Sequence, residues 1–198
     1  MTRMRSAQIT RRTTETEVQI TLSLDGTGVA CITTGIGFLD HMLHHIAQQG
    51  LFDLEVKAVG DLHVDDHHTI EDVARTLGDA FRAALGDKRG IRRYGSFILP
   101  MDEALAGVFV DFSGRPILVY RNALAEKRPG DRMLDLAHVF LQGFADRAAV
   151  ALHVRVESAE DPHHAVEAIF KALGRALRDA TELDPRTHNV PSTKGVLE

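Results

Sequence analysis

The sequence of 198 residues has one cysteine, no tryptophan, two tyrosines and no large excess of charge of either sign. The single cysteine, Cys31, excludes an internal disulfide and is typical of a protein in the reducing cytoplasm. The net charge of −5 predicts neither a nucleic-acid partner nor an anionic-membrane partner. No apolar run approaches the roughly 20 residues that a membrane span requires, and residues 1–12 are polar and basic, which argues against a secretory signal. We therefore expect a cytoplasmic globular protein, in which 44% hydrophobic residues can build a core.

Histidine is the residue type in excess, with 11 copies that fall mostly in short clusters. His67 and His68 are adjacent at the start of a segment with helical periodicity, and Glu71 follows one turn later. Adjacent residues of an α-helix point about 100° apart, because one turn takes ~3.6 residues. Two neighbouring imidazoles at a helix start are therefore expected to face different sites.

The hydrophobic periodicity predicts strands that alternate with helices along the chain. Alternation predicts strands at residues 17–24, 29–33, 52–59 and 151–158, and two more within 95–114. Helical spacing predicts helices at residues 38–50, 65–86, 134–150 and from 162 through 177. The turn signal Asp25-Gly26-Thr27-Gly28 predicts that strands 17–24 and 29–33 form a hairpin. Asp65 or Asp66 is expected to cap the second helix, and Asp161 the last. The fold class is α/β or α+β, with helices on one face of the sheets.

An internal repeat links the two parts of the chain. Residues 67–84 and 163–180 are identical at eight of 18 positions, including both histidines and the glutamate that follows them. A predicted helix and strand precede each copy, and each of these upstream helices carries a histidine, His41 or His138. The chain is therefore expected to consist of two duplicated halves, residues 1–90 and 91–198, that form one catalytic unit.

The repeat supplies eight candidate metal ligands, which divide naturally into two sites of four. They are His41, His67, His68, Glu71, His138, His163, His164 and Glu167. Imidazole and carboxylate without thiolate favour Mn, Fe, Co, Ni or Zn, and four protein ligands would leave positions open for substrate. The remaining histidines have no repeat partner. A structural role is favoured for His44, His45, His63 and His153, while His188, in the irregular tail, is left open.

These segments together resemble the imidazoleglycerol-phosphate dehydratase family, a family of histidine-biosynthesis enzymes. The matching stretches are RRTTET (11–16), GIGFLDHML (35–43), DDHHTIEDVARTLGDAF (65–81), DFSGRP (111–116), HHAVEAIFKALGRAL (163–177) and VPSTKG (190–195). The resemblance covers essentially the whole chain. It implies an α+β fold of duplicated βαβ-containing halves, each a sheet with helices on one face, similar to domain 2 of ribosomal protein S5.

The resemblance also implies two Mn²⁺ ions per active site and a cytoplasmic homo-oligomer of 24 subunits with active sites at subunit contacts. One ion would take His41, His68, His163 and Glu167, and the other His67, Glu71, His138 and His164. Glu15, Glu71 and Glu167 are the implied catalytic residues. The phosphorylated substrate would contact Glu15, His45, Arg93, Arg115, Lys171, Ser192, Thr193 and Lys194. At 44 and 45 the chain departs from the family, which often has a polar pair with glutamine there, so the roles of His44 and His45 stay open.

The implied reaction is the removal of water from imidazole glycerol phosphate to give imidazole acetol phosphate. The C–H bond that must break has no adjacent carbonyl, so metal ions on the ring nitrogens would favour imidazolate, which can expel the neighbouring hydroxyl. Two other classes compete with this lyase: a di-metal phosphatase or amidohydrolase, and a non-enzymatic metal-storage or transport protein. The histidine-rich ligand set disfavours the first, and the Arg/Lys/Ser set disfavours the second.

Overall fold

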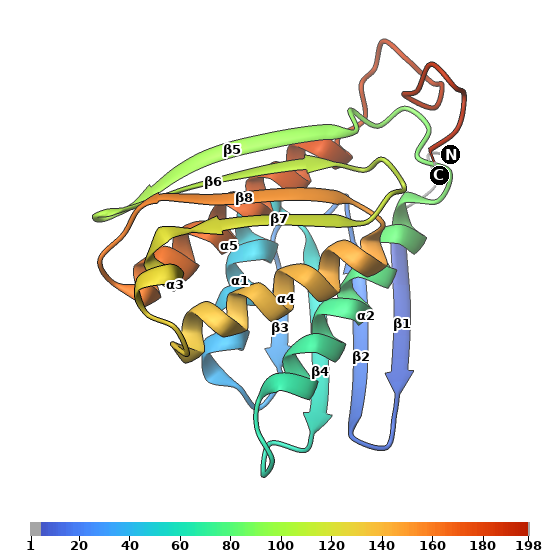
Figure 1. Ribbon diagram of the computed structural model, residues 1–198. Helices are drawn as coiled ribbons and strands as arrows, with labels where there is room; N and C mark the ends of the chain where they lie inside the picture. The colour runs from blue at the N-terminus through green and yellow to red at the C-terminus, as the bar shows by residue number, and fades with distance from the viewer. Residues whose placement is uncertain (1–4, 198) are drawn as a thin grey trace.

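The computed structural model describes residues 5–197, and within this range the strands form two mixed four-stranded sheets (Figure 1). The first sheet has the order β1-β2-β4-β3 and the second β5-β6-β8-β7. The strands are β1 (Ser6–Arg12), β2 (Thr16–Ser23), β3 (Ala30–Thr33), β4 (Asp53–Gly60), β5 (Tyr94–Met101), β6 (Ala104–Asp111), β7 (Ile117–Asn122) and β8 (Ala151–Ser158). The helices are α1 (Gly37–Gly50), α2 (His67–Leu85), α3 (Ala123–Lys127), α4 (Arg132–Ala148) and α5 (Pro162–Thr181).

The two sheets repeat one topology, which confirms the predicted α+β fold of duplicated half-domains. Ile20 of β2 faces Val56 of β4 in an antiparallel pair, and Val108 of β6 faces Val154 of β8 in the same way. The fourth strand of each sheet, β3 or β7, pairs in parallel with β4 or β8. The division between residues 90 and 91 stays a prediction.

The predicted hairpin between residues 17–24 and 29–33 is wrong. Strand β2 pairs with β1 and β4, while β3 lies at the far side of β4. The turn does not close a hairpin because Asp53, at the start of β4, accepts hydrogen bonds from the backbone N–H groups of Thr27 and Val29, at 2.8 and 3.1 Å. These bonds lead the chain across the end of β4 to its other side. The hairpin of this half is β1–β2, whose first strand the sequence did not predict.

The predicted helices are confirmed, and their starts place the histidine pairs. Asp161 caps α5 by accepting from the backbone N–H of His163 at 2.8 Å. Asp66 occupies the N-cap position of α2 but makes no side-chain capping bond among the described residues, and Asp65 instead accepts from the backbone N–H of His67 at 2.9 Å. Both histidine pairs thus stand in the first turn of a helix.

The helices of the two halves pack against one another between the sheets (Figure 1). Helix α1 packs on α5, and α2 packs on α4, so each contact joins one half to the other. Small residues allow the close approach. A Cβ atom on Gly78 of α2 would lie 2.8 Å from the carbonyl oxygen of Phe144 in α4, and one on Gly174 of α5 would lie 2.9 Å from that of Ile46 in α1. Within residues 5–197, none of the helices combines the length and the apolar character needed to cross a bilayer.

Candidate metal and substrate site

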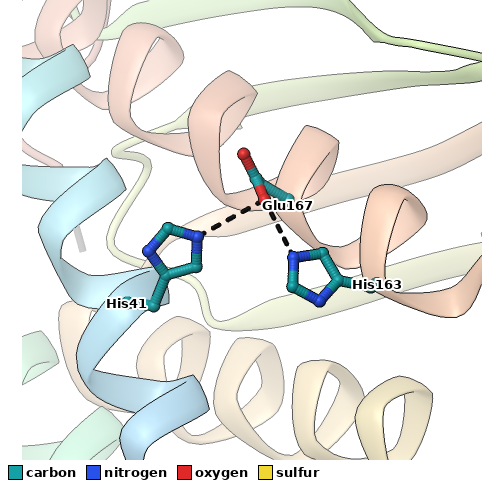
Figure 2. Close-up of side chains that lie close together, drawn as sticks. All are labelled: His41, His163 and Glu167. Carbon is teal, nitrogen blue, oxygen red and sulfur yellow. Dashed lines mark hydrogen bonds and ion pairs between the residues drawn. The ribbon is translucent and has the colours of Figure 1, made fainter.

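Three of the predicted ligands converge where α1 meets α5 (Figure 2). His41 comes from α1, and His163 and Glu167 lie one helical turn apart on α5. The Oε2 atom of Glu167 lies 3.1 Å from Nε2 of His163 and 3.4 Å from Nε2 of His41. One ligand atom of each residue lies within 4.8 Å of the other two. Two imidazole nitrogens and a carboxylate oxygen at this spacing fit a divalent transition-metal ion.

Glu167 divides its two oxygens between different partners. Oε1 lies 2.6 Å from Nζ of Lys171 and 3.3 Å from Nε2 of His45, which leaves Oε2 for the His41–His163 side. Burial alone would raise the pKa of Glu167, but the hydrogen bond and charge of Lys171, with His45 and His41, lower that pKa to about 2. The Glu167 side chain is only 8% exposed, so it presents a fixed anion to the site.

His45 lies beside this cluster, and its Nε2 atom is 3.2 Å from Nε2 of His41. Burial lowers the pKa of His45 to about 4, so the ring is neutral near pH 7. The resemblance named His45 as a substrate contact, whereas reasoning from the residues alone gave it a structural role. Its neighbour His44 contacts the backbone carbonyl oxygen of Asp40 through Nδ1 at 2.7 Å.

His68, the fourth ligand predicted for this ion, belongs to a separate group with Glu15 and Asp61. Its Nδ1 atom lies 2.9 Å from Oδ2 of Asp61 and 3.7 Å from Oε2 of Glu15. The hydrogen bond to Asp61 raises the pKa of His68 above its usual value. His164 has an equivalent partner, because its Nδ1 atom lies 2.8 Å from Oε2 of Glu103.

The other predicted ligands do not form a comparable cluster within residues 5–197. His67 and Glu71 lie on α2 and His138 lies on α4, so the three stand on packed helices as the first three do. The Glu71 side chain is paired with Arg75 at 3.0 Å. The ring of His138 stacks on that of Tyr120, with 5.3 Å between centroids and 15° between planes.

Five of the predicted substrate contacts line one pocket of about 780 Å³, next to Tyr94 at the start of β5. They are Arg93, Arg115, Ser192, Thr193 and Lys194. Arg93 is held in place by Asp111, with Nε 2.7 Å from Oδ1, and by the carbonyl oxygen of Pro191 at 2.9 Å. Lys171 is not part of this pocket, because it is held by Glu167 and contacts the sulfur of Met101 at 3.4 Å. The pocket presents three cationic side chains and the hydroxyl groups of Ser192 and Thr193, which are the kinds of group that bind phosphate.

Asp72 was missed from the sequence, although it anchors the turn that carries Glu15. Its Oδ1 accepts from Nε of Arg11 at 2.7 Å, and its Oδ2 accepts from the hydroxyl of Thr16 at 2.5 Å. The hydroxyl of Thr13 closes the turn by accepting from the backbone N–H groups of Glu15 and Thr16. The Glu15 side chain itself is 54% exposed. An acidic residue beside an apolar stripe gives no sequence signal of such an anchor.

Comparisons with known proteins place this arrangement among close relatives. Residues 34–177 match the family model described as imidazoleglycerol-phosphate dehydratase. The proteins of that name from Janthinobacterium sp. (strain Marseille) and Aromatoleum aromaticum are 52% and 54% identical to this chain. The similarity to the first protein spans 100% of both chains. The similarity to the second spans 98% of this chain and 100% of the relative.

Two solved structures are similar over nearly the whole fold, each with a TM-score of 0.79. The imidazoleglycerol-phosphate dehydratase of Staphylococcus aureus is 34% identical and covers 90% of this chain and 99% of its own. The enzyme from Pyrococcus furiosus, in complex with (S)-C348, is 36% identical and covers 96% of this chain and 100% of its own.

Proposed function

The chain belongs to the imidazoleglycerol-phosphate dehydratase family and is a hydro-lyase of histidine biosynthesis, and we propose that it uses two Mn²⁺ ions per active site. Its reaction converts imidazole glycerol phosphate to imidazole acetol phosphate and water. The observation that carries the metal assignment is the meeting of His41 with His163 and Glu167 across the contact between the two halves. Two nitrogens and one oxygen suit a divalent transition-metal ion, and the family resemblance is the ground for choosing Mn²⁺ among these ions.

The chain's own side chains have distinct roles in this proposal. Bound metal ions would supply Lewis-acid stabilisation of the substrate's imidazolate form. Lys171 holds Glu167 through Oε1 and so orients Oε2 as a ligand. Glu15, on an anchored turn but itself exposed, contacts the diol and moves the proton at the reacting carbon. Lys194, Arg115 and Ser192 bind the phosphate.

We further propose that the active site is completed by a second copy of the chain. His68 and His164 are grouped with their own carboxylates, and the cluster of His41, His163 and Glu167 has three of its four predicted ligands. Contribution of a histidine by a neighbouring chain supplies the fourth. This arrangement accords with the proposed cytoplasmic homo-oligomer of 24 subunits.

The test is turnover of imidazole glycerol phosphate by metal-stripped protein, with and without added Mn²⁺, with both products identified. We expect Mn²⁺ to restore formation of the phosphorylated ketone, with about two ions bound per chain. Release of inorganic phosphate would identify a phosphatase, and many loosely bound ions without turnover would identify a storage protein. His163→Ala should abolish the restored activity. His153→Ala, which changes an exposed histidine of β8, is the matched control and should retain it.

A further inference from the structure

We propose that Asp61 and Glu103 are positioning residues that hold His68 and His164 in the tautomer and orientation needed to bind a metal ion through Nε2. The inference rests on the proposed metal site. In both histidines the Nδ1 atom faces a carboxylate oxygen, at 2.9 Å for Asp61 and 2.8 Å for Glu103. No such carboxylate was predicted from the sequence.

The chemistry follows from the single N–H group of a neutral imidazole. A carboxylate accepts hydrogen bonds, so it favours the tautomer with the proton on Nδ1, which leaves the lone pair of Nε2 free for a metal ion. Partners of this kind also fix the rotation of the ring, and their loss typically weakens metal binding by about 10–100-fold. Asp61 and Glu103 thus act through the histidines and need not touch the metal.

The duplicated topology shows that the two halves reach this arrangement by different routes. Glu15 lies in the β1–β2 turn and Glu103 in the matching β5–β6 turn, and both approach the second histidine of a pair. In the first half, Asp61 directly follows β4 and lies closer to His68 than Glu15 does, at 2.9 against 3.7 Å. In the second half the residue directly after β8 is Ala159, so that position has no carboxylate.

The two turns therefore have different tasks. Glu103 is fixed, because its Oε1 accepts from the backbone N–H groups of Glu160 and Asp161 at 3.2 and 2.9 Å while Oε2 faces His164. Those bonds and the contact with His164 lower the pKa of Glu103 to about 2. In the first half Asp61, and not Glu15, holds the histidine, so Glu15 remains exposed and available to the substrate.

Two amide substitutions distinguish positioning from a general structural role. In Glu103→Gln the amide oxygen is retained by the two backbone N–H groups, so the NH₂ group must face His164 and force its proton onto Nε2. In Asp61→Asn either orientation is open, because Oδ1 of Asp61 has no hydrogen-bond partner within residues 5–197. The asparagine oxygen can then face Nδ1 of His68 and preserve its tautomer.

The experiment is a Mn²⁺ titration of metal-stripped protein followed by electron paramagnetic resonance of the free ion. We expect wild type to bind two ions per chain, and Glu103→Gln to weaken one of them about 10–100-fold and leave the other unchanged. Asp61→Ala should weaken binding of the other ion, the one held by His68, by a similar factor. Asp61→Asn should bind that ion within a few-fold of the wild-type affinity. Glu157→Gln, an exposed carboxylate of β8 paired with Arg155, is the control and should match wild type.

The outcomes separate this inference from the proposed function. Two ions bound by wild type with unchanged affinities in Glu103→Gln and Asp61→Ala would overturn the positioning roles and leave the two-metal dehydratase intact. Equal weakening of both ions by either variant would also overturn them, because it would indicate a general loss of structure. Failure of wild type itself to bind Mn²⁺ would refute the proposed function and the positioning roles with it.

Discussion

Asp72 anchors the turn that carries Glu15, so its replacement by asparagine should reduce both stability and turnover. The Asp72 side chain is 8% exposed and accepts one bond from Arg11 and one from Thr16. A hydrogen bond to a charged group contributes about 1.5–3 kcal/mol and a neutral one about 0.5–1.5 kcal/mol. Asp72→Asn keeps the shape but has only one acceptor oxygen, which can still accept from Arg11 while its NH₂ group must face the hydroxyl of Thr16. Both contacts lose the carboxylate charge, so we expect the free energy of unfolding to fall by about 2–3 kcal/mol.

Asp79→Asn is the matched control, since it changes an arginine-paired aspartate on the same helix. Arg147 binds Asp79 through two N–H groups at 3.0 Å, but the Arg147 side chain is 50% exposed. Exposed ion pairs contribute about 0–1 kcal/mol. Urea unfolding of metal-stripped protein at fixed concentration should therefore distinguish the two variants clearly.

The same pair tests the functional consequence of the anchor. Asp72→Asn should lower kcat, because the turn between Arg11 and Thr16 holds Glu15, and it should leave Mn²⁺ affinity unchanged. Asp79→Asn should leave both quantities at the wild-type level. Equal losses of stability in the two variants, or an unchanged kcat in Asp72→Asn, would refute the assignment of Asp72 as the anchor.

Three further predictions address packing, pH and substrate binding. Gly78→Ala should lower the free energy of unfolding by about 1–2 kcal/mol, because backbone atoms of α4 lie 2.7–2.8 Å from the new Cβ, whereas Gly37→Ala enters open space and should not destabilise. In metal-stripped protein, the lowered pKa of Glu167 stabilises the fold fully above pH 4.5. This contribution is lost as the pH falls toward about 2, so the stability difference between wild type and Glu167→Gln in urea titrations should change over that range. Lys194→Ala should raise KM more than it lowers kcat in steady-state assays, since it removes a phosphate contact and no reacting group.

Local hydrophobic periodicity predicted most of the helices and strands, but it could not predict which strands pair across the chain. The stripes of α2 and α5 are strong and repeated, and their apolar residues are buried. The predicted pairing partner of β2 was wrong because its true partner, β1, is a polar edge strand whose apolar residues are half-exposed and so give a weak alternation signal. The turn sequence alone does not show that Asp53, 24 residues beyond Val29, will accept hydrogen bonds from its backbone and direct the chain to the other side of β4.

The candidate site was predictable as far as the repeat reached. Matched histidines and glutamates identified the residues of the His41, His163 and Glu167 cluster, which the helix contacts then assembled. Asp61, Glu103 and Asp72 were missed because they lie outside the matching positions and act through neighbours in space. Glu103 has a counterpart in Glu15, but the correspondence appears only once the two sheets are aligned.

The most direct test of a two-metal site shared between chains is complementation of two inactive variants. His68→Ala lacks the ligand predicted to come from a second chain, and Glu167→Ala lacks one from the cluster of the first. The variants are stripped of metal, mixed and reassembled with Mn²⁺, and turnover of imidazole glycerol phosphate is measured. We expect the mixture to recover activity that neither variant shows alone, because some sites then combine intact ligands from both chains. A fully mixed oligomer that remains inactive would contradict a metal site shared between chains.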